Sequence, residues 1–271
     1  MTTAPSPNVP LALRRRAAIA LVLGSLAAAA WAASADRMHG MTMADRFSVG
    51  SFGFFVVLWV LMMAAMMFPS VWPAVALYGL VLRRRPATAA RAPGRLGAFV
   101  AGYLGSWTVA GLIAFGLLAG ARAAGLGDLS DEQVARDVVA PVALLGAAYQ
   151  AVPFKQACLS HCRGPLSFFL QHWRDGPQGA LLMGARHGGY CVGCCWLLMV
   201  VLLALGVMSL TWMAAVSLAI AAEKLAPARW ARYASGLLAA ALVVLGVVAA
   251  ARPSWLPGVD AGTGGMDMGD M

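Results

Sequence analysis

Three cysteines stand within five positions of the segment "CVGCCWLLM", residues 191–199. A thiol can bind a soft metal ion, exchange with a disulfide, or pack as a small apolar group. A helix through this segment would place sulfur and imidazole donors on one stripe, because residues four apart are neighbours on a helix. The members of this stripe are Met183, His187, Cys191, Cys195 and Met199, with Cys194 beside Cys191. Three cysteines this close together favour functional thiols over inert packing.

A second group of sulfur donors stands in the segment "MMAAMMFP". Met62 and Met66, and likewise Met63 and Met67, form i, i+4 pairs on an expected helix. Ordinary core packing is the alternative, because methionine fills irregular gaps. Pro69 follows directly, and a proline frees backbone carbonyls in a span, which favours a metal-binding role for this helix.

A third group is carried by "YQAVPFKQACLSHCRGP", in which Cys158 and Cys162 are four apart with His161 between them. Paired cysteines beside a histidine are a moderate signal for a metal site. The alternative is an interfacial loop in which Lys155 and Arg163 extend to lipid phosphates.

Methionines without any cysteine mark the two segments that we expect on the outer side of a membrane. They are Met38, His39, Met41 and Met43 in "MHGMTM", and Met266, Met268 and Met271 in the C-terminal tail. Thioethers select Cu(I) and cannot form disulfides, whereas thiols tend to oxidise in a periplasm. For either segment taken alone, the alternative is a flexible stretch without a binding role.

The composition predicts an integral membrane protein. Of the 271 residues, 61% are hydrophobic and only 11% are charged, against about 25% charged in soluble domains. The net charge of +9 arises from basic clusters beside apolar runs, so membrane topology explains it better than a nucleic-acid partner. Five cysteines, an odd number, argue against a complete disulfide framework.

We predict an all-α, polytopic transmembrane helix bundle of about seven spans, since each apolar run approaches the length that crosses a bilayer. The runs lie near residues 17–33, 51–82, 96–120, 138–154, 178–208, 209–222 and 230–251. The second and fifth runs exceed one bilayer thickness, so we expect breaks at Pro69 and Pro73 in the second run and at Gly188-Gly189 in the fifth.

The distribution of arginine and lysine sets the orientation. With the N-terminus inside, fourteen basic residues fall inside and five outside, as the positive-inside rule requires. The C-terminus is then periplasmic. The first run also resembles a signal peptide that ends at Ala33-Ser34-Ala35. We favour an uncleaved first span, and cleavage would leave six spans.

These features divide the chain into five parts. They are a first span or signal peptide (1–35), an outer Met/His-rich loop (36–50), a core membrane domain (51–226), a last span (227–251) and an outer Met/Asp-rich tail (252–271).

The segments "MMAAMMFPS", "YQAVPFKQACLSHCRGP", "GGYCVGCCWLLM" and "EKLAP" together resemble a bacterial family of predicted metal-binding integral membrane proteins, domain-of-unknown-function family 2182. The resemblance covers about residues 51–226 and implies metal binding in a membrane without a mechanism. The ligands that it implies are Met62, Met63, Met66, Met67, Cys158, Cys162, Cys191, Cys194 and Cys195.

The leading hypothesis is a protein of the bacterial inner (cytoplasmic) membrane that binds Cu(I) for transport or delivery and is not an enzyme. Zinc is the rival metal, because cysteine together with His161 or His187 suits it equally well, but the methionine excess favours copper. The expected partners are the metal ion, the lipid bilayer, and a periplasmic copper carrier or a copper oxidase. No nucleic acid is expected.

Two alternatives stay open. One is a membrane thiol-disulfide oxidoreductase in which Cys191 and Cys194 exchange with Cys158 and Cys162. The other is a membrane assembly partner of a copper enzyme.

Overall fold

The computed structural model describes residues 9–38, 52–84, 90–125, 131–205 and 210–256, and its secondary structure there is helical throughout. This confirms the all-α prediction. The longer helices are α1 (Val9–Met38), α2 (Phe52–Arg84), α4 (Ala92–Ala123), α6 (Ala140–Tyr149), α7 (Pro153–Arg163), α8 (Pro165–His172), α9 (Gly176–Leu205), α10 (Leu210–Leu225) and α11 (Ala231–Ala251). The short α5 (Asp131–Val134) and the π-helical turn η3 (Ala135–Val139) precede α6 directly. Two 3₁₀ turns, η4 (Ala228–Trp230) and η5 (Pro253–Trp255), flank α11.

Six of the seven predicted apolar runs coincide with a single helix where the structure describes them, whereas the fourth (138–154) covers η3, α6 and the start of α7. Not every helix is long enough to cross a bilayer. Within the described ranges, five helices (α1, α2, α4, α9 and α11) have the length and hydropathy of a span. A sixth candidate is the bent pair Ala135–Tyr149 and Pro153–Arg163, whose two parts meet at 70°. The remaining run, α10, has 16 residues, or about 24 Å of helix against roughly 30 Å of hydrocarbon. The structure therefore gives five to six candidate spans, where the sequence predicted about seven. The division of the chain into five parts stays a prediction.

The predicted breaks in the two long runs are wrong. Helix α2 continues through Pro69 and Pro73, and α9 continues through Gly188 and Gly189. A proline removes one backbone hydrogen bond, and packing of the neighbouring helices can hold the helix together. The break occurs instead at Pro153, which starts α7 after the bend.

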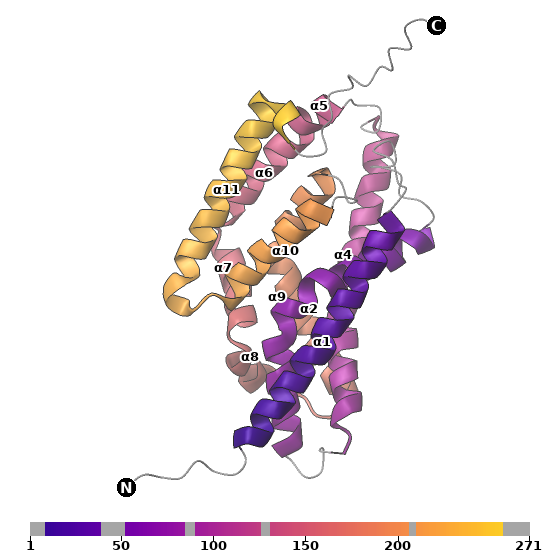
Figure 1. Cartoon of the computed structure of the whole chain (residues 1–271), viewed down its shortest axis with the longest axis vertical. Helices are drawn as coiled ribbons and strands as arrows, with labels where there is room; N and C mark the ends of the chain where they lie inside the picture. Colours follow the sequence, from indigo (N-terminus) through magenta and orange to yellow (C-terminus); the bar gives the residue numbers. More distant parts are fainter. Residues whose placement is uncertain (1–8, 39–51, 85–89, 126–130, 206–209, 257–271) are drawn as a thin grey trace, which may run out of the picture.

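The helices form a bundle in which α1, α2 and α4 run in alternating directions, as do α10 and α11 (Figure 1). Helix α1 packs along α2, α2 along α4, and α4 along α9, while α11 covers α6. The start of α1, the end of α2 and the start of α4 lie at one end of the bundle, the lower end in Figure 1. These three helix ends carry Arg14, Arg84 and Arg95 respectively. We call this end of the bundle the basic end.

Glycines let α4 and α9 approach closely. A Cβ atom at Gly188 would lie 2.8 Å from the backbone oxygen of Tyr103, and one at Gly184 would overlap the backbone of Phe99. Small residues at such positions allow two helix backbones to touch. The close approach brings the side chain of Tyr103 against Cys191, at the centre of the site described next.

Candidate metal centre

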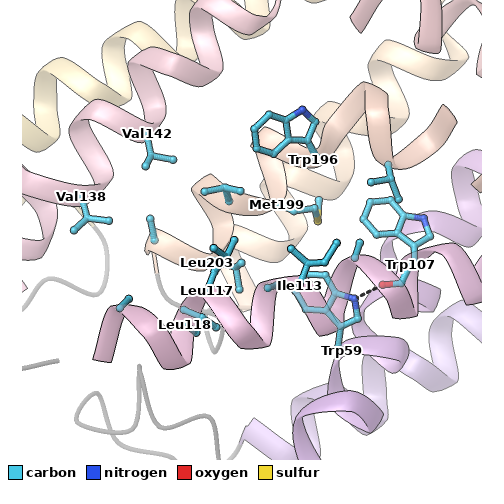
Figure 2. Close-up of a pocket in the computed structure, with 16 residues that line it drawn as sticks. Trp59, Trp107, Ile113, Leu117, Leu118, Val138, Val142, Trp196, Met199 and Leu203 are labelled. Carbon is cyan, nitrogen blue, oxygen red and sulfur yellow. Dashed lines mark hydrogen bonds between the residues drawn. The ribbon is translucent and has the colours of Figure 1, made fainter. Parts of the chain in front are cut away.

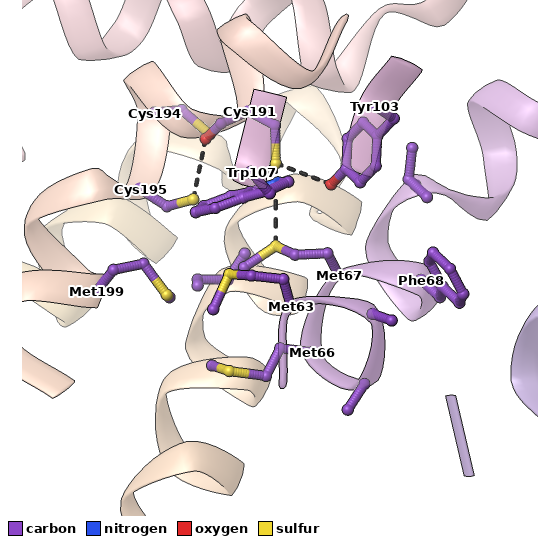
Figure 3. Packing of buried hydrophobic residues seen from close by; sticks show 14 of the residues in the cluster. Met63, Met66, Met67, Phe68, Tyr103, Trp107, Cys191, Cys194, Cys195 and Met199 are labelled. Carbon is purple, nitrogen blue, oxygen red and sulfur yellow. Dashed lines mark hydrogen bonds between the residues drawn. The ribbon is translucent and has the colours of Figure 1, made fainter. Parts of the chain in front are cut away.

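Cys191 lies where four helices meet. Its side chain is 1% exposed, and its Sγ atom lies 3.9 Å from Sδ of Met67 on α2. The hydroxyl oxygen of Tyr103 on α4 lies 3.0 Å from the same Sγ, and the ammonium group of Lys224 on α10 donates to it at 2.8 Å. Figure 3 shows the thiol between Tyr103 and Met67, with the ring of Trp107 beside the contact. A thiol and a thioether from two helices are thus placed together away from solvent.

Three further thiols surround Cys191. Cys194 and Cys195 follow within a helical turn, and both thiols donate to the backbone oxygen of Cys191, at 3.1 and 2.9 Å. The thiol of Cys162 on α7 interacts with those of both Cys191 and Cys194. All of these cysteines are free thiols. We call Met67, Cys162, Cys191, Cys194 and Cys195 the sulfur cluster.

The spacing between Met67 and Cys191 fits a shared metal ion. Two sulfur atoms bound at about 2.3 Å to one ion, with an angle of 120° between the bonds, lie about 4.0 Å apart. The observed separation of the two sulfurs is 3.9 Å. The thiols of Cys194 and Cys195 point to a backbone oxygen and would have to rotate to join them. Among the residues that the structure describes, no group of three or more His, Cys, Asp or Glu side chains is arranged to hold a metal ion. The pair whose spacing fits a shared metal ion is therefore the thiol of Cys191 and the thioether of Met67.

The four methionines predicted on the second run are all buried in α2, at 1% exposure or less. Met67 reaches Cys191, and Met63 lies beside Met67 one turn earlier (Figure 3). Met66 lies farther from the thiols in the same view. Met62 is buried in the core. The structure thus brings one of the four into direct contact with a cysteine.

The predicted stripe on α9 divides into a sulfur part and an aromatic part. Met199 lies beyond Cys195 on the sulfur side (Figure 3). His187, one turn before Cys191, is 2% exposed and packs against the rings of Phe99 and Phe168. Its Nδ1 atom is buried without a hydrogen-bond partner.

Two predicted ligands on α7 lie apart from the Cys191–Met67 pair. The ring of His161 stacks on Tyr190 with centroids 4.2 Å apart, and its Nδ1 atom lies 2.9 Å from the backbone oxygen of Ala157. Cys158 is buried against Gly193 of α9, where an added Cβ atom would lie 2.8 Å from the Cys158 sulfur. Cys162 is therefore the α7 ligand candidate that reaches the cluster directly.

The outer methionine segments cannot be placed. His39, Met41, Met43, Met266, Met268 and Met271 lie outside the described residues. Met38 is the last residue of α1, and its side chain is not described either.

Lys224 and Tyr103 were not among the predicted site residues. Lys224 stands at the end of an apolar run, where an extended, exposed lysine is the ordinary expectation. In the structure it is buried, and its ammonium group reaches Cys191, Ser70 at 3.5 Å and Met67 at 3.8 Å. A charged residue inside an apolar run is the signal that could have found it. No local pattern pairs Tyr103 with a thiol.

A buried ion pair fixes the helices that carry Cys162 and Lys224. Lys155, expected at the membrane surface, is instead fully buried, and its Nζ atom donates to both carboxylate oxygens of Glu223 at 2.7 and 2.8 Å. Gln150 and Ser235 complete the network through Lys155 and Glu223 respectively. Arg163 adds a hydrogen bond to the backbone oxygen of Glu223 at 2.6 Å. These bonds hold α7 and α11 against the end of α10.

An apolar pocket lies toward the C-terminal ends of α4 and α9, and Figure 2 shows the residues that line it. Its volume is about 420 Å³, and its walls include Trp59, Trp107, Trp196 and Met199. The indole nitrogen of Trp59 donates to the backbone oxygen of Trp107 at 2.8 Å, which fixes one wall. The lining has no charged side chain, so the pocket is a hydrophobic environment.

Comparison with known proteins relates the chain to copper handling. The chain matches the copper chaperone family PpoB2 over residues 56–249, a stretch that contains the whole sulfur cluster. No curated protein and no solved structure matches it. The match supports the relationship to copper that the sequence predicted, and it does not test the numbered family that the motifs resemble. The match covers more than half of the chain, and the chain therefore belongs to the copper chaperone family PpoB2.

Proposed function

We propose that the protein binds Cu(I) at the sulfur cluster and hands it to other carriers without acting as an enzyme. The observation that carries this proposal is the buried contact of 3.9 Å between the thiol of Cys191 and the thioether of Met67. A thiolate and a thioether form a soft ligand pair, which selects Cu(I). Zinc is bound in proteins by thiolates, histidine and carboxylates, whereas this pair includes a thioether.

The neighbouring thiols supply a route for transfer. The thiol of Cys162 interacts with those of both Cys194 and Cys191. An ion that is bound by two sulfurs can gain a third ligand before it loses the first. Stepwise ligand exchange of this kind moves Cu(I) without releasing it into solvent. A cluster with more sulfurs than the ion needs is therefore suited to delivery.

We further propose that the protein lies in the bacterial inner membrane, with the basic end in the cytoplasm and the C-terminus in the periplasm. The gathering of basic residues at the start of α1, the end of α2 and the start of α4 supports this orientation. The thiols then face the reducing compartment, in which they stay free.

The test is Cu(I) binding by the full chain, purified in detergent under reducing, anaerobic conditions. Cu(I) affinity is measured by competition with a coloured Cu(I) chelator, and the ligand set by X-ray absorption. Cys191→Ser and Met67→Leu should each lower the affinity at least about tenfold, as changes at a metal site commonly do. Met213→Leu is the matched control, because Met213 is equally buried but stands eleven residues, roughly 16 Å of helix, from Lys224.

Equal affinities in the wild type, Cys191→Ser and Met67→Leu would refute the proposed site. The oxidoreductase alternative predicts a different result. Thiol trapping in cells would then capture a reversible disulfide between Cys191 and Cys194, or mixed disulfides with other proteins.

A further inference from the structure

A second cavity opens beside the sulfur cluster at the α10–α11 turn. Its volume is about 380 Å³, and its walls come from α2, α7, α8, the end of α10 and the segment that follows it. Its lining includes Cys162, Arg163, Lys224 and Ala226. Small-molecule sites commonly have volumes of about 300–1,000 Å³, so the cavity has room for one small organic molecule.

The charged side chains on the wall of this cavity are both cations. Arg163 uses two of its nitrogens on backbone oxygens, Nε on Glu223 and Nη2 on Ala231. A guanidinium group has five N–H donors, so Arg163 keeps donors for a ligand. Lys224 is held by sulfur and hydroxyl partners, and the carboxylate of Glu223 is bound to Lys155. A ligand with carboxylate groups would therefore find complementary charge here.

Cys162 joins the cavity to the sulfur cluster. Its side chain is partly exposed, it lines the cavity, and its thiol interacts with those of Cys191 and Cys194. Cys191 is 1% exposed and does not line the cavity. A molecule in the cavity therefore reaches the cluster through the Cys162 sulfur.

We propose that this cavity binds a small, anionic thiol compound and that Cu(I) passes there between the compound and Cys162. The inference rests on the proposed function and names the carrier class for the same site. In the loading direction the bond between copper and the carrier sulfur breaks, and a bond between copper and the Cys162 sulfur forms. The proton of the Cys162 thiol ends on the carrier thiolate. Copper stays Cu(I), so the step needs no oxidant or reductant, and the reverse step unloads the protein.

The recognition part is tested without copper. S-methylglutathione carries two carboxylates and cannot bind Cu(I) as a thiolate, so calorimetric titration of the full chain reports on the cavity alone. We expect binding to the wild type and to the control Arg232→Gln, which changes an exposed arginine near the same turn. Arg163→Gln should weaken binding by about tenfold or more, through loss of a charge-assisted hydrogen bond. Ala226→Phe, which fills the cavity and leaves Arg163 in place, should abolish it.

The transfer part compares two copper sources. Loading from Cu(I)–glutathione should slow at least tenfold in Arg163→Gln and Ala226→Phe, while loading from the Cu(I)–acetonitrile complex stays at the wild-type rate. No binding of S-methylglutathione, or equal binding and equal loading rates in all variants, overturns the cavity proposal and leaves the proposed function intact. Failure of the wild type to load from either source overturns the proposed function itself.

Discussion

Replacing Gly188 with alanine should push α4 away from α9 at the level of the sulfur cluster, whereas the same change at Gly189 should not. An added Cβ atom at Gly188 would lie 2.8 Å from the Tyr103 backbone oxygen and 2.9 Å from Cβ of Ser106. At Gly189 no described atom lies within 4 Å of the added Cβ. The two positions are adjacent in one helix, so they differ chiefly in what the methyl group meets.

The size of the effect follows from the overlap. Carbon atoms in contact are about 3.5–4.0 Å apart, so α4 must move by roughly 0.6 Å or more to admit the methyl group at Gly188. Overpacking of this kind costs about 1–3 kcal/mol. Exchange of glycine for alanine within a helix gains about 0.5–1 kcal/mol. Because the gain is common to both variants, the difference between them isolates the overlap at about 1–3 kcal/mol.

Thermal unfolding in detergent measures this difference. At about 2–4 °C for each kcal/mol, Gly188→Ala should melt about 2–12 °C below Gly189→Ala. The Cu(I) affinity should also fall in Gly188→Ala alone, because the movement of α4 lengthens the 3.0 Å contact between Tyr103 and Cys191. Equal melting temperatures and equal affinities would show that the tight contact between α4 and α9 is absent.

Three further predictions concern the partners of the cluster. Removing the carboxylate with Glu223→Ala should destabilise the protein by about 3–5 kcal/mol, because it leaves the buried ammonium of Lys155 unpaired, and adding Lys155→Met should recover most of this loss in thermal unfolding. Tyr103→Phe removes the hydroxyl next to Cys191 and should lower the Cu(I) affinity about 10–100-fold in chelator competition; an unchanged affinity would contradict a role for this hydroxyl. Gly193→Ala should cost about 1–3 kcal/mol through its overlap with the Cys158 sulfur, and the loss should disappear in Cys158→Ala, which removes that atom.

Hydrophobicity was enough to predict where the helices lie, but not how they bend or how far they reach. The apolar runs became helices, because a chain in hydrocarbon must satisfy its backbone hydrogen bonds internally. The helix break that we predicted in the second run was misplaced, because a proline interrupts a helix only where neighbouring helices cannot compensate for the lost hydrogen bond. Pro69 lies inside a helix packed on several sides and is tolerated, whereas Pro153 follows the bend and starts a new helix. That difference is a property of the packed bundle and cannot be read from the residues alone.

The sequence predicted the sulfur ligands of the candidate site, but not the polar side chains that contact them. The i, i+4 rule placed Cys191 and Cys195 on one face, and soft-metal chemistry brought in Met67 from another span. The rule cannot distinguish Met67 from Met66, since that choice depends on the rotation of α2 against α9. Lys224 escaped because lysines at span ends usually extend to water, and only the tertiary fold shows that this one turns inward.

The dipeptide Glu223-Lys224 connects the buried ion pair with the sulfur cluster. Neighbouring residues on a helix point about 100° apart, so at the end of α10 one side chain faces α7 and α11 while the other faces α2 and α9. Glu223 binds Lys155 and Ser235 and thereby fixes the position of the helix end. That position sets where the ammonium of Lys224 stands relative to Cys191. A monovalent cation is thus already placed against the sulfur atoms that we propose for Cu(I). Binding of Cu(I) to these sulfurs, as we propose it, would displace this ammonium, and the cavity that Lys224 itself lines offers space for the displaced side chain.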